Sequence, residues 1–191
     1  MFSGIIEHQA KILDKKDGLF RMENTFGNSL KEGQSIAHDG ACMTLTKIEN
    51  NYYEFFAMEE TLRVTNFGTK KVNDTFNVER CIQIGERLDG HFVTGHIDTT
   101  GTVTRLEKKD DGSLIYGVNF DPKYNNLLIE KGSITLNGVS LTVVEVRDGF
   151  LSVSLIPLTQ DWTNLGTSEI GDTVNLEFDM IGKYVTKLTH K

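Results

Sequence analysis

An internal repeat constrains the fold of this chain more than any other feature of its sequence. The segment SIAHDGACMTLTKI, which begins at Ser35, recurs as SITLNGVSLTVVEV from Ser133, 98 positions later. The same spacing aligns AMEETLRVTNFGTKKVNDTFNVE, from Ala57, with LIPLTQDWTNLGTSEIGDTVNLE, from Leu155, without a gap. Self-similarity at a fixed spacing is typical of repeated structural units. The sequence therefore predicts two copies of one small domain.

The start of the chain belongs to the same pattern at a shorter spacing. FSGIIE, from Phe2, matches VTGHID, from Val93, and the change in spacing indicates an insertion between about Gly101 and Ser133. Each half is long enough for a small domain of its own. We predict a first domain over residues 1–90, a second over 91–179 and a separate C-terminal segment over 180–191.

Asx-Gly pairs mark the turns of both halves. Asp39-Gly40 and Asn137-Gly138 lie between alternating apolar runs, and both residue types tolerate the positive φ of a two-residue hairpin. Three Asp-Gly pairs, at 17–18, 111–112 and 148–149, indicate further turns of this kind. Runs rich in Val, Ile, Thr, Tyr and Phe separate them. The pattern predicts an all-β fold of two small antiparallel barrels, which close on themselves and leave no exposed edge.

Few helices are expected inside the two halves. Asp121-Pro122 followed by KYNNLLIEKG supplies a cap, a proline at the first helical position and a terminating glycine. This pattern predicts a helix over 122–131. Shorter helices are expected over 59–66 and 157–165.

The C-terminal segment has the pattern of a short amphipathic helix. Its apolar residues recur at helical spacing, at Ile181, Tyr184, Val185 and Leu188. Lysines lie between them, and the helix dipole favours positive charge near the C-terminal end of a helix. A lone helix of this length is marginal in water, so it needs a surface to pack on. A partner subunit is one candidate.

The composition is typical of a globular protein, with 38% apolar and 25% charged residues. A net charge of -7 disfavours nucleic acid as a partner, because a phosphate backbone requires a clustered cationic surface. No apolar run approaches the roughly 20 residues that span a bilayer, and the start at Met1 lacks the basic residues of a secretory signal. We therefore expect a cytoplasmic protein without a membrane partner. Cys42 and Cys81 are expected as thiols, although their number alone allows a disulfide.

Two histidines in GHFVTGHIDTTGTV, residues 90–103, raise the question of a metal site. On a strand their odd separation sends His91 and His96 to opposite faces, and no third ligand stands nearby at a recognisable spacing. His96 and Asp98 would share a face, so the carboxylate would orient the imidazole or raise its pKa. The alternative is a histidine that only forms hydrogen bonds at a barrel rim. Because His96 aligns with Ile5 in the first half, the asymmetry favours a functional histidine.

Cys42 and Ser140 occupy equivalent positions in the two halves. Each follows an Asx-Gly hairpin and precedes a threonine by two residues, Thr44 or Thr142. A thiol and a hydroxyl are nucleophilic or hydrogen-bonding groups, which favours one site in each half. The alternative is that both are small residues that fill a strand. Glycine-rich dinucleotide, P-loop and CxxC patterns do not occur in the sequence.

The chain resembles the riboflavin synthase family over essentially its whole length. Seven motifs carry the resemblance in order: MFSGI, SIAHDGACMTL, NVER, GHFVTGHID, KGSITLNGVSLTV, LIP followed by a threonine, and NLEFD with KYV. The resemblance implies two homologous six-stranded Greek-key antiparallel β-barrels and a C-terminal helix over 180–191 that helps to form a homotrimer. It also implies a reaction without metal or cofactor. Two molecules of 6,7-dimethyl-8-ribityllumazine dismutate by transfer of a four-carbon unit, giving riboflavin and 5-amino-6-(D-ribitylamino)uracil.

In this family the site lies between the N-terminal barrel of one subunit and the C-terminal barrel of a neighbour. The motifs place one lumazine on the N-terminal barrel, at Gly4, Ile5, Ile6, Cys42, Met43, Thr44, Phe56, Ala57, Met58, Glu59, Glu60 and Thr61. They place the other on the C-terminal barrel, at Lys131, Ser140, Leu141, Thr142, Ser154, Leu155, Ile156, Pro157, Leu158 and Thr159. Gly95, His96 and Ile97 are expected at the site as well.

The implied chemistry removes a proton from the 7-methyl group of one lumazine and adds a nucleophile to the electrophilic carbon of the other. His96 is expected to assist the proton transfer, Ser140 and Cys42 to position or attack the rings, and Asp179 to order the site. Whether the nucleophile is a side chain or water stays open, as does an association with a lumazine synthase. The alternative function is a non-catalytic lumazine- or flavin-binding antenna protein. Such relatives have degenerate C-terminal motifs, whereas the motifs here are intact.

Overall fold

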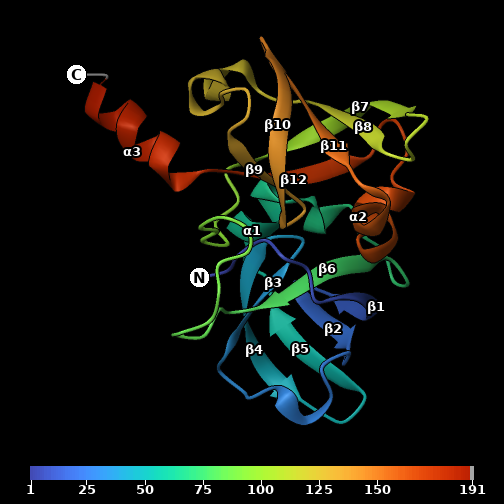
Figure 1. Ribbon diagram of the computed structural model, residues 1–191. Helices are drawn as coiled ribbons and strands as arrows, with labels where there is room; N and C mark the ends of the chain where they lie inside the picture. The colour runs from blue at the N-terminus through green and yellow to red at the C-terminus, as the bar shows by residue number, and fades with distance from the viewer. Residues whose placement is uncertain (190–191) are drawn as a thin grey trace.

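The computed structural model describes residues 1–189, which form two closed β-barrels placed one above the other (Figure 1). The strands of the first barrel are β1 (His8–Lys16), β2 (Leu19–Glu23), β3 (Ser35–His38), β4 (Ala41–Ile48), β5 (Tyr52–Phe56) and β6 (Thr75–Arg80). Those of the second are β7 (Thr99–Lys108), β8 (Leu114–Asn119), β9 (Ser133–Leu136), β10 (Val139–Arg147), β11 (Phe150–Leu155) and β12 (Thr173–Phe178). The order around the first barrel is β1-β2-β5-β4-β3-β6, and the second repeats it as β7-β8-β11-β10-β9-β12. The predicted duplication and all-β fold are confirmed.

The predicted Asx-Gly pairs form the hairpin turns. Asp39-Gly40 joins β3 to β4 and Asn137-Gly138 joins β9 to β10, with positive φ at all four residues. The two turns meet back to back, because a Cβ on Gly138 would lie 2.7 Å from the backbone nitrogen of Gly40. This approach excludes a side chain on either glycine. The pairs at 17–18, 111–112 and 148–149 likewise join consecutive strands.

Short helices follow β5 and β11 at equivalent points. They are α1 (Glu59–Val64) with the 3-10 turn η2 (Asn66–Gly68), and α2 (Pro157–Trp162) with η4 (Asn164–Thr167). A further 3-10 turn, η1 (Gly27–Ser29), follows β2. Both short helices expected from the sequence are confirmed, each broken into an α-helical and a 3-10 part.

The helix predicted over 122–131 is wrong in type and length. The segment forms a 3-10 helix, η3 (Pro122–Leu127), and Leu128 is extended and buried in the second barrel. Asn125 bonds Asp148 and the backbone of Gly149 in a neighbouring hairpin. These tertiary contacts and the burial of Leu128 outweigh the local helical signals.

Each barrel encloses its own hydrophobic core. The first core is aromatic, with four rings in contact: Phe20, Phe55, Phe67 and Phe76. At the positions equivalent to the last three, the second core holds aliphatic residues: Val153, Leu165 and Val174. The two barrels therefore share a backbone design but fill it with different side chains.

Buried polar side chains join the two barrels at their contact. They are Asp39, Asn66 and Asn77 with the repeat counterparts Asn137, Asn164 and Asn175. The backbone N–H of Asn66 donates to Asn175 Oδ1 at 2.6 Å, and the counterpart bond spans 2.8 Å. Asp39 is the one charged member, and Lys70 Nζ lies 3.3 Å from its carboxylate. Because a buried polar group without a partner is strongly unfavourable, this network holds the barrels in one relative orientation.

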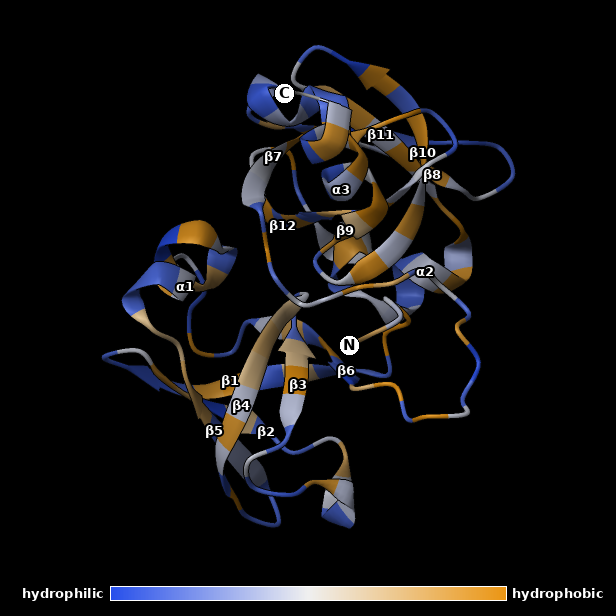
Figure 2. Cartoon of the chain, turned by 90° about the vertical axis from the view of Figure 1, so that its left-hand side faces the viewer, coloured by the Kyte–Doolittle hydropathy of each residue, from blue (hydrophilic) through white to orange (hydrophobic). Residues whose placement is uncertain are grey.

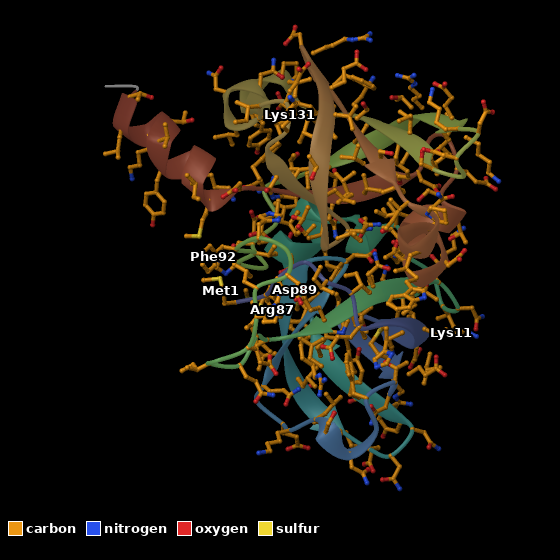
Figure 3. All side chains as sticks on the ribbon, viewed as in Figure 1. Met1, Lys11, Arg87, Asp89, Phe92 and Lys131 are labelled. Atoms are coloured by element: carbon orange, nitrogen blue, oxygen red, sulfur yellow. The ribbon has the colours of Figure 1, made fainter. Side chains whose placement is uncertain are left out.

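The segment that precedes each barrel crosses over and packs on the other barrel of the same chain. Phe2 and Val93 exchange backbone hydrogen bonds of 2.8 and 3.1 Å where the two segments meet. Ile6 then packs against the core of the second barrel, whereas Ile97 packs against that of the first. Figure 3 shows Met1 and Phe92 together at the waist of the molecule. Residues 90–98 are irregular around this crossing, so the strand assumed there is wrong and β7 begins only at Thr99.

The C-terminal helix α3 (Met180–Thr189) projects from the second barrel (Figure 1). It touches the body near η3, where Thr186 Oγ1 donates to the Asn126 carbonyl at 3.3 Å. Its apolar side chains are exposed: Ile181, Tyr184, Val185 and Leu188. Apolar bands are visible on this helix in Figure 2. The predicted helix is confirmed as far as Thr189, and positions 190–191 lie outside the described residues. Within residues 1–189, no helix is both long and apolar enough to cross a membrane.

Candidate active site

Cys42 on β4 lies against the segment that precedes the second barrel. Its backbone N–H donates to the Gly95 carbonyl at 2.9 Å. Gly95 has φ +81°, and a Cβ there would lie 2.5 Å from the Cβ of Cys42, so only glycine fits this approach. His96 follows Gly95 directly and its side chain is exposed. The crossing therefore brings His96 to the first barrel, beside Cys42.

Ser140 on β10 has the matching place in the second barrel. Its backbone N–H donates to the Gly4 carbonyl at 2.8 Å, and a Cβ on Gly4 would lie 2.6 Å from the Cβ of Ser140. Ile5, the counterpart of His96, follows and is 47% exposed. The two half-sites therefore have the same backbone geometry, with a thiol and an imidazole in one and a hydroxyl and a branched aliphatic side chain in the other.

The expected grouping of residues is corrected by this exchange. Gly4, Ile5 and Ile6 belong with Ser140 on the second barrel, not with Cys42 on the first. Gly95, His96 and Ile97 belong with Cys42 on the first barrel. The physical reason is the backbone pairing of Phe2 with Val93, which sends each leading segment past its own barrel.

His91 is a functional candidate that the sequence argument passed over. Its Nδ1 lies 2.7 Å from the hydroxyl of Ser140, a hydrogen bond between residues 49 positions apart. Burial lowers the pKa of His91, while the negative charge of Asp179 opposes that effect. In the tautomer that carries its proton on Nε2, a neutral imidazole accepts the serine proton at Nδ1, which is the arrangement that activates a hydroxyl. Local sequence carries no signal of this contact, since the two residues are far apart in the chain.

Within residues 1–189, no histidine forms a hydrogen bond to the thiol of Cys42. This thiol is half-buried, and burial raises its pKa, which favours the protonated form. Cys42 and Cys81 are both free thiols packed beside Phe2 and Val93 at the crossing. A protonated thiol suits hydrogen bonding and ring contact better than nucleophilic attack.

Most of the remaining expected residues lie on an exposed face of each barrel. On the first barrel β4 and β5 carry Thr44 and Phe56, and Met58 leads into α1. Phe56 and Met58 are 52% and 64% exposed. On the second barrel Ile156 and Leu158, at the start of α2, are 55% and 50% exposed.

Of the other residues expected in these faces, the structure places the following on or next to the same elements. On the first barrel these are Glu59, Glu60 and Thr61; on the second they are Lys131, Leu141, Thr142, Ser154, Pro157 and Thr159. Three expected residues are not part of these faces, because their side chains are buried in the barrel cores: Met43, Ala57 and Leu155. Lys131 is held beside β10 by its backbone bond to the Val143 carbonyl, 2.8 Å long. Each face is an open half-site with apolar groups directed to solvent.

The aspartates near the crossing, Asp98 and Asp179, accept hydrogen bonds from backbone N–H groups, and Asp98 also pairs with a lysine. Asp98 accepts from the Phe178 N–H at 2.9 Å and from Lys183 Nζ at 2.6 Å. Both bonds involve the same oxygen, Oδ2, and within residues 1–189 no hydrogen bond joins the His96 ring to Asp98, so the expected orientation of His96 by Asp98 is not the arrangement found. Asp179 accepts from the backbone N–H of Ile181 at 2.9 Å, at the start of α3.

Two buried glutamates hold the turns that carry the half-sites. Glu177 accepts from the backbone N–H and the hydroxyl of Thr94 and from the Gly95 N–H, at 2.7, 2.6 and 3.0 Å. Glu79 makes the matching bonds to Ser3 and Gly4, at 2.7, 2.7 and 3.0 Å. Burial raises the pKa of both carboxyl groups, and these hydrogen bonds oppose the rise.

Comparison with known proteins defines the class of this fold and site. The lumazine binding domain matches the chain twice, over residues 3–81 and 94–179. The crystal structure of LumP complexed with riboflavin superposes with a TM-score of 0.83 at 26% identity, covering 93% of this chain and 99% of that one. LumP complexed with 6,7-dimethyl-8-(1'-D-ribityl) lumazine gives 0.81, also at 26% identity, covering 93% and 98%. The chain is therefore a protein of two tandem lumazine-binding domains.

Similar sequences narrow the class further. Riboflavin synthase of Actinobacillus pleuropneumoniae is 40% identical over 196 residues, covering 100% of this chain and 91% of that protein. Riboflavin synthase of Escherichia coli (strain K12) is 37% identical, covering 94% and 87%. That of Schizosaccharomyces pombe is 36% identical, covering 98% and 93%. The chain belongs to the riboflavin synthase family of enzymes.

Proposed function

We propose that this protein joins two molecules of 6,7-dimethyl-8-ribityllumazine, transferring a four-carbon unit from one to the other. The products are riboflavin and 5-amino-6-(D-ribitylamino)uracil. The observation that carries the proposal is the pair of half-sites, which have the same backbone geometry but different reactive groups. Two identical substrates with unequal roles, one donor and one acceptor, require two such pockets.

The active site is completed between subunits of a homotrimer. Both half-sites are open faces with exposed apolar side chains, such as Phe56 and Ile156, and α3 projects with its own apolar residues uncovered. An N-terminal barrel facing the C-terminal barrel of a neighbour would cover both substrates and hold them in contact. Holding the reacting atoms together supplies much of the rate acceleration by proximity.

The histidines divide the proton transfers between the half-sites. His96, beside Cys42, assists removal of a proton from the 7-methyl group. His91 accepts the proton of Ser140, whose oxygen positions or attacks the second ring, and a water held by the same pair can serve instead. Cys42 positions the first ring, and Asp179 orders the site by fixing the start of α3 beside His91.

Turnover with the lumazine as sole substrate tests the function. Riboflavin should accumulate beyond one equivalent per subunit. A bound chromophore at fixed stoichiometry, without product, would instead favour an antenna protein, the second candidate that the likeness to LumP brings.

Glutamine variants test the two histidines. His91→Gln and His96→Gln should each lower kcat by at least roughly tenfold, because general acid-base groups contribute that much or more. A variant that keeps full turnover removes its histidine from the mechanism.

A further inference from the structure

The glutamate at the end of β12 fixes the turn that precedes His96. One oxygen of the Glu177 carboxylate accepts from both the backbone N–H and the hydroxyl of Thr94, and the other accepts from the Gly95 N–H. The Thr94 hydroxyl oxygen in turn accepts from the backbone N–H of His96 at 3.3 Å. Glu177 is only 3% exposed, so solvent does not replace these bonds. A chain of hydrogen bonds therefore runs from Glu177 to the backbone of His96.

The same turn also reaches the thiol side of the half-site. The carbonyl of Gly95 accepts from the Cys42 N–H, and the Cα of Gly95 leaves no room for movement toward Cys42. A shift of the turn would therefore change the distance between His96 and any ring held by Cys42. Because a misplacement of about 1 Å can lower a rate roughly a hundredfold, small shifts here have large effects.

Glu79 forms an equivalent clamp in the other half. It holds Ser3 and Gly4 with the same set of bonds, and Ser3 Oγ accepts from the backbone N–H of Ile5 at 3.3 Å. This clamp precedes an isoleucine rather than a histidine. The chain thus supplies a matched control, in which the same bonds support a residue without acid-base chemistry.

Building on the function proposed above, we propose that Glu177 is a positioning residue for the proton transfer. It acts through Thr94 and Gly95 to fix His96 against the lumazine on the first barrel. Glu79 fixes the second half-site and has no coupling to His96.

A double-mutant cycle on the full-length protein tests this coupling. Glu177→Gln keeps the shape of the side chain but turns an amide N–H₂ toward a backbone N–H. We expect it to lower kcat by roughly tenfold or more while KM changes by less than about threefold. In the His96→Gln background the same change should lower kcat by no more than about twofold, since there is no imidazole left to position.

Glu79→Gln is the control for a general loss of structure. It should lower the midpoint of thermal unfolding about as much as Glu177→Gln, and it should lower kcat by the same factor in both backgrounds. If Glu177→Gln lowers kcat by the same factor in the parental protein and in the His96→Gln protein, the inference is overturned. This holds even where His96→Gln by itself lowers kcat. Full turnover of His96→Gln contradicts the role proposed for His96 and overturns the positioning role with it.

A second pair of variants leaves the buried carboxylate untouched. Thr94→Val removes the hydroxyl that links Glu177 to the His96 backbone, and we expect the same dependence on His96. Thr94→Ser restores the hydroxyl that Ser3 supplies in the first half, and turnover should recover. The inference is contradicted if Thr94→Val keeps the parental kcat. It is also contradicted if the kcat of Thr94→Ser is no higher than that of Thr94→Val.

Discussion

At the scale of single residues, a buried histidine distinguishes the first barrel from the second. His38 is fully buried on β3, and its Nε2 lies 2.9 Å from the hydroxyl of Tyr53. The repeat counterparts of these two residues are Leu136 and Leu151, which are fully buried in the second core. Burial lowers the pKa of His38 to about 3, so it stays neutral in the folded protein.

This pair predicts an acid sensitivity that belongs to the first barrel. In the unfolded chain His38 regains its ordinary pKa near 6.5 and binds a proton as the pH falls. Its contribution to stability is thus complete above pH 6.5 and is lost between pH 6.5 and 3, by about 1.4 kcal/mol per pH unit. Replacing the pair together, His38→Leu with Tyr53→Phe, should remove that part of the slope in denaturant unfolding measured from pH 7 to 4. An unchanged slope in the double variant would contradict the assignment.

Residue types at repeat positions could be predicted from sequence, whereas contacts across the crossing could not. Cys42 and Ser140 were found because an alignment of the two halves places them together. His91 was missed because its bond to Ser140 joins residues 49 positions apart, and no local spacing in the sequence indicates such a contact. Asp98 was assigned to His96 by strand alternation, and the strand does not exist at that point.

At the scale of elements, strands and hairpins follow from sequence and η3 does not. Alternating apolar residues indicate strands and Asx-Gly pairs indicate hairpin turns, and both signals depend only on residues that are close in sequence. The strands and turns of the barrels can therefore be predicted directly. The segment 122–131 has sound helical signals, but Asn125 and Leu128 make tertiary contacts that an α-helix would break. Local propensity is a weak guide wherever packing opposes it.

The exposed helix α3 predicts a role in assembly. Its four apolar side chains, each more than half exposed, gain stability only when a partner covers them, by roughly 1.5 to 3 kcal/mol for each one fully buried. Removal of residues 180–191 should therefore give a smaller species in sedimentation velocity, with the barrels still folded by circular dichroism. An oligomer that is unchanged after truncation would show that α3 does not hold the subunits together.

At the scale of the whole molecule, duplication supplies one candidate binding face per barrel, while the crossing makes the two faces unlike. A single ancestral pocket would treat two lumazines alike. Here the second copy brings His96 to the first barrel, and His91 comes to Ser140 on the second. The fold of each half was evident from sequence, but this assignment of residues to barrels depends on the pairing of Phe2 with Val93.

Complementation between blocked subunits tests the central claim, that the two lumazines react between an N-terminal barrel and the C-terminal barrel of a neighbour. Thr44→Arg fills the exposed first half-site and Thr142→Arg the second, so each variant alone should be inactive. Co-expressed in equal amounts, they should regain about one quarter of the parental riboflavin formation, because a quarter of head-to-tail contacts in a closed ring join two unblocked faces. Mixed trimers with no activity would contradict the account, since they would place both reacting lumazines on the same subunit.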